Sequence, residues 1–129
     1  MTSNILSAFN DQLSCFIDDM LILYPNDVDI MYAKNSFTTI RKMNPRLVIS
    51  VWQDKINSLY FNQIMSGDLE FFLNKDYSTD LAESQNSSKI MESINRLRQP
   101  IRGMDTNNRE KAMRYLQNIS NLSNLYFSK

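Results

Sequence analysis

The sequence predicts an all-α protein, a compact bundle of five to six helices in a single domain over residues 1–129. Apolar residues recur at spacings of three and four along the chain, which is the period of an amphipathic helix. The chain has only two glycines and three prolines, a composition that suits long helices better than the turns of a β-sandwich. Its 129 residues, 43% of them hydrophobic, can bury an independent core.

The first two helices are predicted on either side of "YPND". Ser3 or Asn4 can cap the first helix, and Pro25 ends it. Asn26 or Asp27 can cap the second, which continues to about Met43. The two apolar stripes consist of Ile5, Phe9, Leu13, Phe16, Ile17, Met20 and Tyr24, and then of Ile30, Ala33, Phe37 and Ile40.

A long third helix is predicted after "NPR", with Asn44 as N-cap and Pro45 at the first helical position, where its missing N–H costs nothing. Ser66-Gly67 ends it, and Asp68 caps a short, strongly apolar turn, "LEFFL". The apolar face of the third helix consists of Leu47, Val48, Val51, Trp52, Ile56, Leu59, Tyr60 and Ile64.

The last two helices follow a polar loop at about residues 74–88. The fifth begins near Ser87 or Ser88, with an apolar stripe of Ile90, Ile94, Leu97, Ile101 and Met104. Pro100 should kink or end it, and Gly103 can supply a positive-φ stop. Asp105 or Thr106 caps the last helix, whose stripe is Ala112, Met113, Leu116, Ile119, Leu122 and Tyr126.

The predicted core draws on all of these helices. Its residues are Leu13, Phe16, Phe37, Val51, Trp52, Phe72, Leu97, Ile101, Leu116 and Ile119.

The residue types argue against catalysis and metal binding. Histidine, the commonest general base and metal ligand, is absent, and the single cysteine, Cys15, is expected to be a small core residue. Asp18 and Asp19 are neighbours on a helix and point about 100° apart. Asp76 and Asp80 lack the spacing and the glycine of an EF-hand loop. We therefore expect no catalytic residue, no metal and no cofactor.

Charge is distributed in alternating blocks although the net charge is zero. Residues 1–33, 34–66, 67–93 and 94–129 have net charges of −5, +4, −4 and +5. Such blocks allow oppositely charged helices to lie against one another, or they give the molecule separate acidic and basic faces.

The last basic block contains the candidate partner-binding residues. On a helical wheel Arg98 and Arg102 share one flank of the apolar stripe, whereas Arg96 lies on the far side. The basic residues continue in the last helix, so the candidate set is Arg98, Arg102, Arg109, Lys111 and Arg114. Pairing with the protein's own acidic blocks is favoured for these residues, and an external phosphate or carboxylate is the alternative.

Four stretches, "NPR", "GDLEFFLNKDYSTDL", "INRLRQPIRGM" and "AMRYLQNISNLSNLYF", resemble a family of small uncharacterised proteins encoded by large double-stranded DNA viruses of eukaryotes, algal and mimivirus-like ones in particular. The resemblance spans about Phe9 to Phe127. It implies a viral protein acting in the host cytoplasm or a viral factory, or in the virion. It supplies no catalytic residue.

These features favour a non-enzymatic viral interaction protein that docks a viral or host protein through charged helix faces. The alternative is a nucleic-acid-binding accessory factor using the basic block at 96–114, although a pI near 6.2 is low for that class. No apolar run approaches 18 residues and no signal peptide is apparent, so we expect neither a membrane protein nor a secreted one. The partner, the stage of infection and the oligomeric state stay open.

Overall fold

The structure is a computed structural model that describes residues 2–74 and 85–128, and within these ranges it contains helices and no strand. The all-α prediction is confirmed. The helices are α1 (Thr2–Leu23), α2 (Val28–Met43), α3 (Leu47–Val51), the π-helix η1 (Trp52–Asn57), α4 (Ser58–Met65), α5 (Leu69–Asn74), α6 (Gln85–Arg102) and α7 (Thr106–Phe127).

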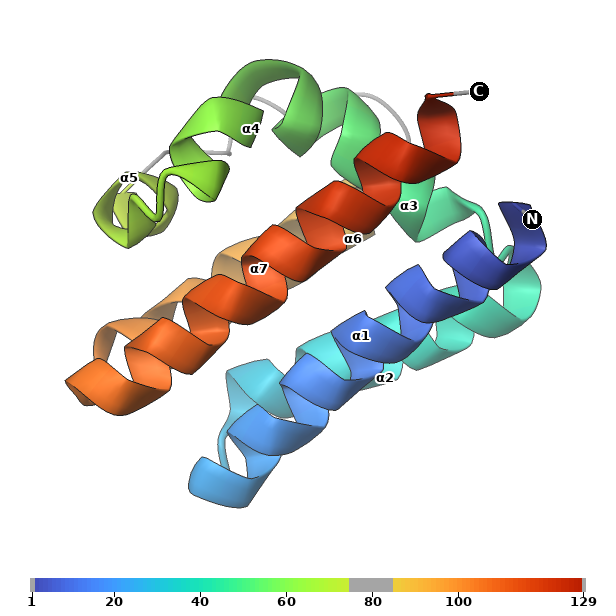
Figure 1. Ribbon diagram of the computed structural model, residues 1–129. Coiled ribbons are helices and arrows are strands. Elements are labelled where there is room, and N and C mark those ends of the chain that lie inside the picture. The colour runs from blue at the N-terminus through green and yellow to red at the C-terminus, as the bar shows by residue number, and fades with distance from the viewer. Residues whose placement is uncertain (1, 75–84, 129) are drawn as a thin grey trace.

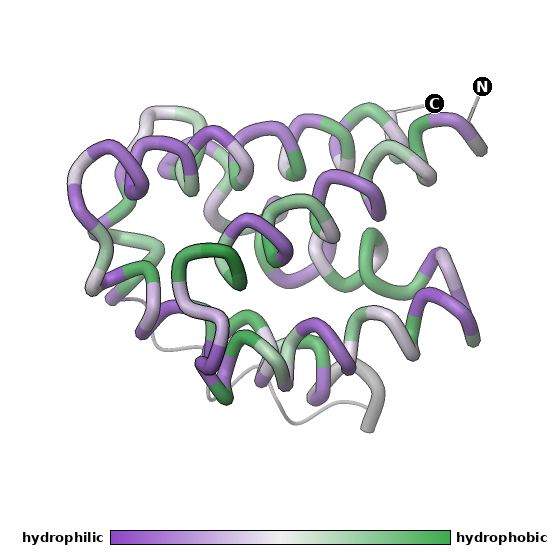
Figure 2. Tube along the Cα trace, turned by 90° about the horizontal axis from the view of Figure 1, so that it is seen from below, coloured by the Kyte–Doolittle hydropathy of each residue, from purple (hydrophilic) through white to green (hydrophobic). Residues whose placement is uncertain are grey.

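Four long helices form the body of the domain (Figure 1). α1 packs against both α2 and α7, and α2 packs against α6. The continuous segment α3–η1–α4 crosses one end of this body and contacts α7, and α5 packs between α4 and α6. The tube in Figure 2 shows apolar residues of the long helices turned toward the interior. The ends of α1 and α6 and the start of α7 therefore meet at one end of the bundle.

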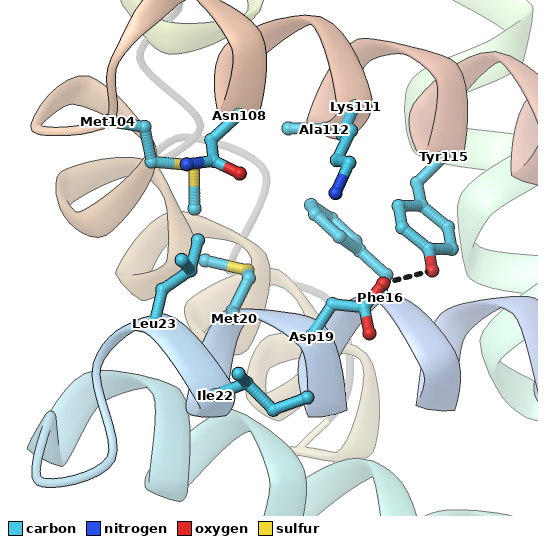
Figure 3. Close-up of a pocket in the computed structure, with 10 residues that line it drawn as sticks. All are labelled: Phe16, Asp19, Met20, Ile22, Leu23, Met104, Asn108, Lys111, Ala112 and Tyr115. Atoms are coloured by element: carbon cyan, nitrogen blue, oxygen red, sulfur yellow. Dashed lines mark hydrogen bonds between the residues drawn. The ribbon is translucent and has the colours of Figure 1, made fainter.

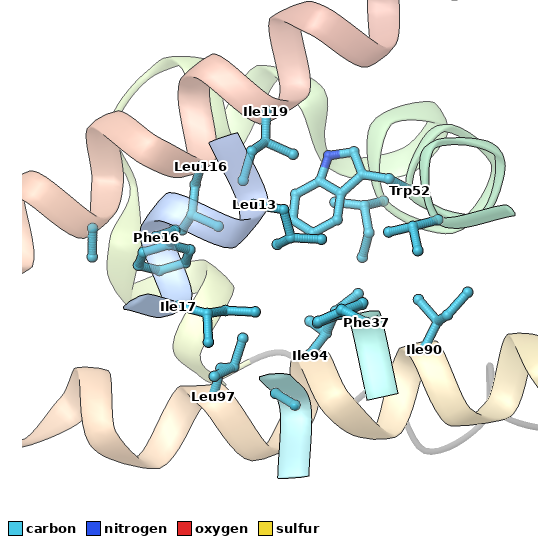
Figure 4. Close-up of a cluster of buried hydrophobic side chains, with 14 of the residues drawn as sticks. Leu13, Phe16, Ile17, Phe37, Trp52, Ile90, Ile94, Leu97, Leu116 and Ile119 are labelled. Atoms are coloured by element: carbon cyan, nitrogen blue, oxygen red, sulfur yellow. The ribbon is translucent and has the colours of Figure 1, made fainter. Parts of the chain in front are cut away.

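All ten predicted core residues are buried, with at most 6% of any of them exposed. Side chains from α1, α2, η1, α6 and α7 meet in one cluster (Figure 4). Burying a large aliphatic or aromatic side chain contributes about 1.5–3 kcal/mol, so this cluster is the main stabilising feature of the fold.

Three aspartates begin helices as the sequence predicts. Asp27 accepts hydrogen bonds from the N–H groups of Asp29 (2.9 Å) and Ile30 (3.0 Å) at the start of α2. Asp68 accepts one at α5 and Asp105 one at α7, from Phe71 (3.0 Å) and Asn108 (2.9 Å) respectively. At the end of α4, Gly67 adopts a φ of 82°, which a side chain would disfavour.

Several predicted helix ends are wrong. α1 already contains Ser3 and Asn4, so neither caps it. Asn44 is the C-cap of α2 and not the N-cap of the next helix. Pro45 is not the first helical residue either, because residues 44–46 form a turn, closed by a hydrogen bond from the Leu47 N–H to the Asn44 carbonyl (3.1 Å), and α3 begins at Leu47.

The predicted fifth helix also differs at both ends. α6 begins at Gln85, ahead of the predicted start near Ser87 or Ser88. Most of the predicted loop, residues 75–84 with Asp76 and Asp80, lies outside the described residues. Pro100 lies inside α6, which ends two residues later at Arg102. Gly103 has no positive φ, because its N–H bonds the Gln99 and Pro100 carbonyls in a tightened last turn.

Outside the ten-residue core list, two expectations of burial are wrong: Cys15, expected to be a small core residue, and Leu59, placed on the apolar face of the third helix, are both exposed. Cys15 lies about 200° around α1 from Leu13, on the face opposite the buried stripe. Leu59 is 59% exposed because the π-helical turn before it alters the register that an uninterrupted α-helix would have. A hydrogen bond in a π-helix spans one residue more than in an α-helix, as the bond from the Ser58 N–H to the Gln53 carbonyl does.

Candidate docking groove

The five candidate basic residues do not form one patch. Arg98 is only 9% exposed, and its Nε donates to the carbonyl oxygen of Leu73 over 2.9 Å. Arg102 donates to the same carbonyl. Leu73 lies in the last turn of α5, so this pair of arginines secures the end of α5 to α6.

Other basic residues pair with the protein's own acids, as the alternating charge blocks allow. Arg109 of α7 contacts Glu70 of α5 at 2.6 Å. Arg96 contacts Asp29 at 3.3 Å and Glu92 at 3.1 Å, and it also lies over the ring of Tyr32. The pairs Lys34–Asp18 and Arg41–Asp11 join α2 to α1.

Lys111 and Arg114 differ from these residues. Both are exposed on α7, and neither has an ion pair or side-chain hydrogen bond within residues 2–74 and 85–128. They are three residues apart, so they occupy neighbouring positions on the helix surface. Of the predicted set, these two residues are the ones available to an external group.

An apolar hollow of about 180 Å³ lies beside Lys111, where the last turns of α1 face the first turns of α7 (Figure 3). Both methionine side chains in Figure 3 point into it, Met20 from α1 and Met104 from the turn after α6. The hollow is lined by Phe16, Asp19, Met20, Ile22, Leu23, Met104, Asn108, Lys111, Ala112 and Tyr115. We call it the α1–α7 groove.

The rim of the groove exposes apolar side chains that the core does not use. Ile22 is 77% exposed and Leu23 is 43% exposed, both in the last turn of α1. Val28 and Met31, just after the α1–α2 turn, are also exposed (73% and 47%), but they do not line the hollow. A group of exposed apolar residues beside a hollow is typical of an interaction site.

The polar wall of the groove is held in place by Tyr115 and Asp19. The Tyr115 hydroxyl donates to the Asp19 carboxylate, and the Tyr115 ring stacks on Phe16 with centroids 5.1 Å apart. This hydrogen bond, then partial burial and then the negative charge of Asp19 raise the pKa of Tyr115 to about 12. Tyr115 is therefore protonated at neutral pH and can continue to donate to Asp19.

A second, more polar hollow continues the groove along the α1–α7 seam. Its lining includes Lys111 and Tyr115, which also line the apolar hollow, and it adds Arg114. Asn118 and Gln12 bridge the two helices at this end through a hydrogen bond of 3.4 Å. The groove is thus apolar near the end of α1 and cationic farther along α7.

The sequence identifies the cationic part of this site but not the apolar part. Lys111 and Arg114 belong to the predicted set, whereas Ile22 and Leu23 do not. The sequence nevertheless contains a sign that Ile22 and Leu23 are exposed, because both lie outside the apolar stripe that ends in Met20 and Tyr24.

The titratable side chains that line the apolar hollow are Asp19, Lys111 and Tyr115. In the described part of the chain, no three histidine, cysteine or acidic side chains come together as metal ligands would. None of the described helices combines the length and the apolar content needed to cross a bilayer.

Comparisons with protein-family models, with curated proteins and with solved structures find no match to this chain. The functional assignment therefore depends on the contacts and charges of the groove.

Proposed function

We propose that this protein is a non-enzymatic interaction protein and that it docks a protein partner in the α1–α7 groove. One observation carries the proposal. An apolar hollow with exposed Ile22 and Leu23 on its rim lies beside Lys111 and Arg114, two cations without a partner in the described chain. A protein surface can satisfy both parts of this site, since protein interfaces combine an apolar centre with a polar rim.

Nucleic acid fits this groove less well. Affinity for nucleic acid comes largely from several cations on successive phosphates. Here Arg98 and Arg102 bond the end of α5, and Arg109 pairs with Glu70. The remaining two candidates, Lys111 and Arg114, are too few to contact several successive phosphates.

The resemblance to proteins of large DNA viruses supports a partner that is itself viral or a host protein. In this proposal the complex forms in the host cytoplasm or a viral factory, or within the virion.

The test is affinity purification of the tagged protein from infected cells, with nuclease treatment to exclude bridging by nucleic acid. We expect a stable protein partner to be recovered with the wild type. Recovery should fall with Ile22→Ser, which removes apolar surface from the rim, and with the double variant Lys111→Glu/Arg114→Glu.

Matched substitutions at the other end of the bundle provide the controls. Met43→Ser removes a residue that is 71% exposed, and Lys42→Glu/Arg46→Glu makes the same change of charge at two exposed residues without side-chain partners in the described chain. These variants should recover the partner as the wild type does. The proposal is overturned if no partner is recovered, or if the groove variants and the control variants recover it equally.

A further inference from the structure

The chemistry of the bound segment can be inferred from the groove, on the premise of the proposed function. The apolar hollow measures about 180 Å³. An apolar protein cavity of about 150 Å³ accepts benzene, so this hollow has room for one large side chain. It therefore suits a partner that inserts a single anchor residue.

The lining of the hollow favours an aromatic anchor. Met20 and Met104 place flexible thioethers in the hollow, and sulfur makes favourable contacts at the edges of aromatic rings. Phe16 adds an aromatic wall, whose ring is already fixed by stacking on Tyr115. Aromatic anchors also recur as the dominant residues of protein interfaces.

The charges beside the hollow favour an acidic neighbour for that anchor. Lys111 and Arg114 contribute two positive charges, and Asp19 contributes one negative charge, so the net charge of this wall is positive. One oxygen of Asp19 already accepts the Tyr115 hydroxyl bond. A carboxylate on the bound segment would give the two cations the partner that they lack within the described residues.

We propose that the α1–α7 groove binds a short acidic segment of the partner protein that carries one aromatic anchor. The anchor enters the hollow between Leu23 and Met104, and the acidic side chains lie farther along α7, toward Arg114 and Asn118. If the segment is helical, an anchor and an acid three or four residues apart share one face and can reach both parts of the groove.

Selection of peptides from a random display library tests this inference with a defined probe. The immobilised full-length protein should enrich peptides with one aromatic residue and at least one Asp or Glu three or four positions away. In solution, Lys111→Glu/Arg114→Glu should weaken binding of such a peptide by about tenfold or more, because two attractive pairs become repulsive. Lys42→Glu/Arg46→Glu should leave its affinity within about twofold, as expected for charges beyond the screening length.

Three outcomes would overturn the inference. The selected peptides could lack acidic residues, or they could bind the Lys111→Glu/Arg114→Glu variant as tightly as the wild type. The protein could also self-associate through the groove, which Ile22→Ser would then abolish, and the occupant would be a second copy of the chain. None of the peptide results bears on the capture from infected cells, so the proposed function can stand when this inference fails.

Discussion

The side chain of Arg98 links α6 to the backbone of α5. Its Nε donates to the carbonyl of Leu73, in the last turn of α5. The final carbonyls of a helix have no partner within the helix, and a cation near them also meets the negative end of the helix dipole. The buried guanidinium therefore has a structural role.

Removing this contact should destabilise the protein. We expect Arg98→Ala to lower the free energy of unfolding by about 1.5–3 kcal/mol, the range for a hydrogen bond to a charged group. Arg114→Ala, at an exposed cation, should change it by less than about 0.5 kcal/mol. Urea denaturation followed by circular dichroism measures both. Equal stability of the two variants would show that the contact of Arg98 with α5 contributes little.

Tyr115 should report the integrity of the groove through its ionisation. Hydrogen bonding to Asp19 is the largest cause that raises its pKa to about 12. We expect Asp19→Asn to lower the pKa of Tyr115 toward the ordinary value of about 10. Absorbance of tyrosinate during an alkaline titration measures this, and Tyr115→Phe identifies which of the six tyrosines is responsible.

The raised pKa of Tyr115 also determines how the stability of the fold changes with pH. Below about pH 10 the phenol is protonated in both the folded and the unfolded chain, and its contribution is complete. Between about pH 10 and about pH 12 the unfolded chain releases the proton first, so stability falls as the pH rises. In Tyr115→Phe this part of the decline should disappear. A decline that is unchanged in Tyr115→Phe would assign it to other groups.

At the scale of single elements, the π-helix η1 shows how a distant contact alters a local pattern. The Trp52 indole N–H donates to the Ser120 hydroxyl over 3.0 Å, and the Asn57 amide donates to the Ser120 carbonyl over 2.8 Å. Ser123 adds a bond of 2.9 Å to Gln53. Ser120 and Ser123 are completely buried, and their small side chains let η1 approach α7 closely.

Ser120→Ala should therefore destabilise the fold, although it removes only one oxygen atom. The indole N–H of Trp52, which is 2% exposed, would be buried without its acceptor, at a cost of about 1–3 kcal/mol. Ser14→Ala removes the same atom at an exposed position inside α1, so it is the matched control and should be nearly neutral. Thermal unfolding compares the two. Equal unfolding temperatures of the two variants would show that the hydrogen bond between Trp52 and Ser120 contributes little to stability.

Helix starts set by aspartate caps are predictable because cap and helix are adjacent in sequence, as at Asp27, Asp68 and Asp105. The π-helix is not predictable, because its side chains bond to α7 more than 60 residues away. The prediction of a buried Cys15 is wrong since it rests on the apolar neighbours of this residue and not on its place on the helical wheel.

The candidate site also has a part that the sequence predicts and a part that depends on contacts between distant helices. A wheel places Arg98 and Arg102 on one flank of α6, but it cannot show that the end of α5 lies against that flank. Lys111 and Arg114 are identified by charge alone, and the hollow beside them depends on α1. The groove is therefore a tertiary feature, and the sequence contains only its cationic half.

At the scale of the whole molecule, several charges of the alternating blocks form ion pairs between helices in the described part of the chain. α1 and α2 are joined by Lys34–Asp18 and Arg41–Asp11, and α5 and α7 by Arg109–Glu70. Such exposed pairs contribute about 0–1 kcal/mol each, so their main effect is on the surface that remains. The end of α2 and the start of α7 lie at opposite ends of the bundle (Figure 1). Each carries an exposed cation without a partner in the described chain, Lys42 in the last turn of α2 and Lys111 near the start of α7.

This layout predicts weak binding to nucleic acid. Among the described residues, a phosphate backbone placed on the groove would meet two cations, Lys111 and Arg114. We therefore expect the logarithm of affinity for duplex DNA to fall with the logarithm of salt concentration with a slope no steeper than about −2. Fluorescence anisotropy between about 50 and about 200 mM salt measures this slope, and Lys111→Glu/Arg114→Glu should abolish the residual binding. An affinity that falls about a thousandfold over this range requires six or more phosphate contacts. Such a result would contradict the proposed docking function and favour the alternative, a nucleic-acid site in the basic block at 96–114. The additional phosphate contacts would then require Arg96 and Arg109 to leave their ion pairs with Asp29 and Glu70.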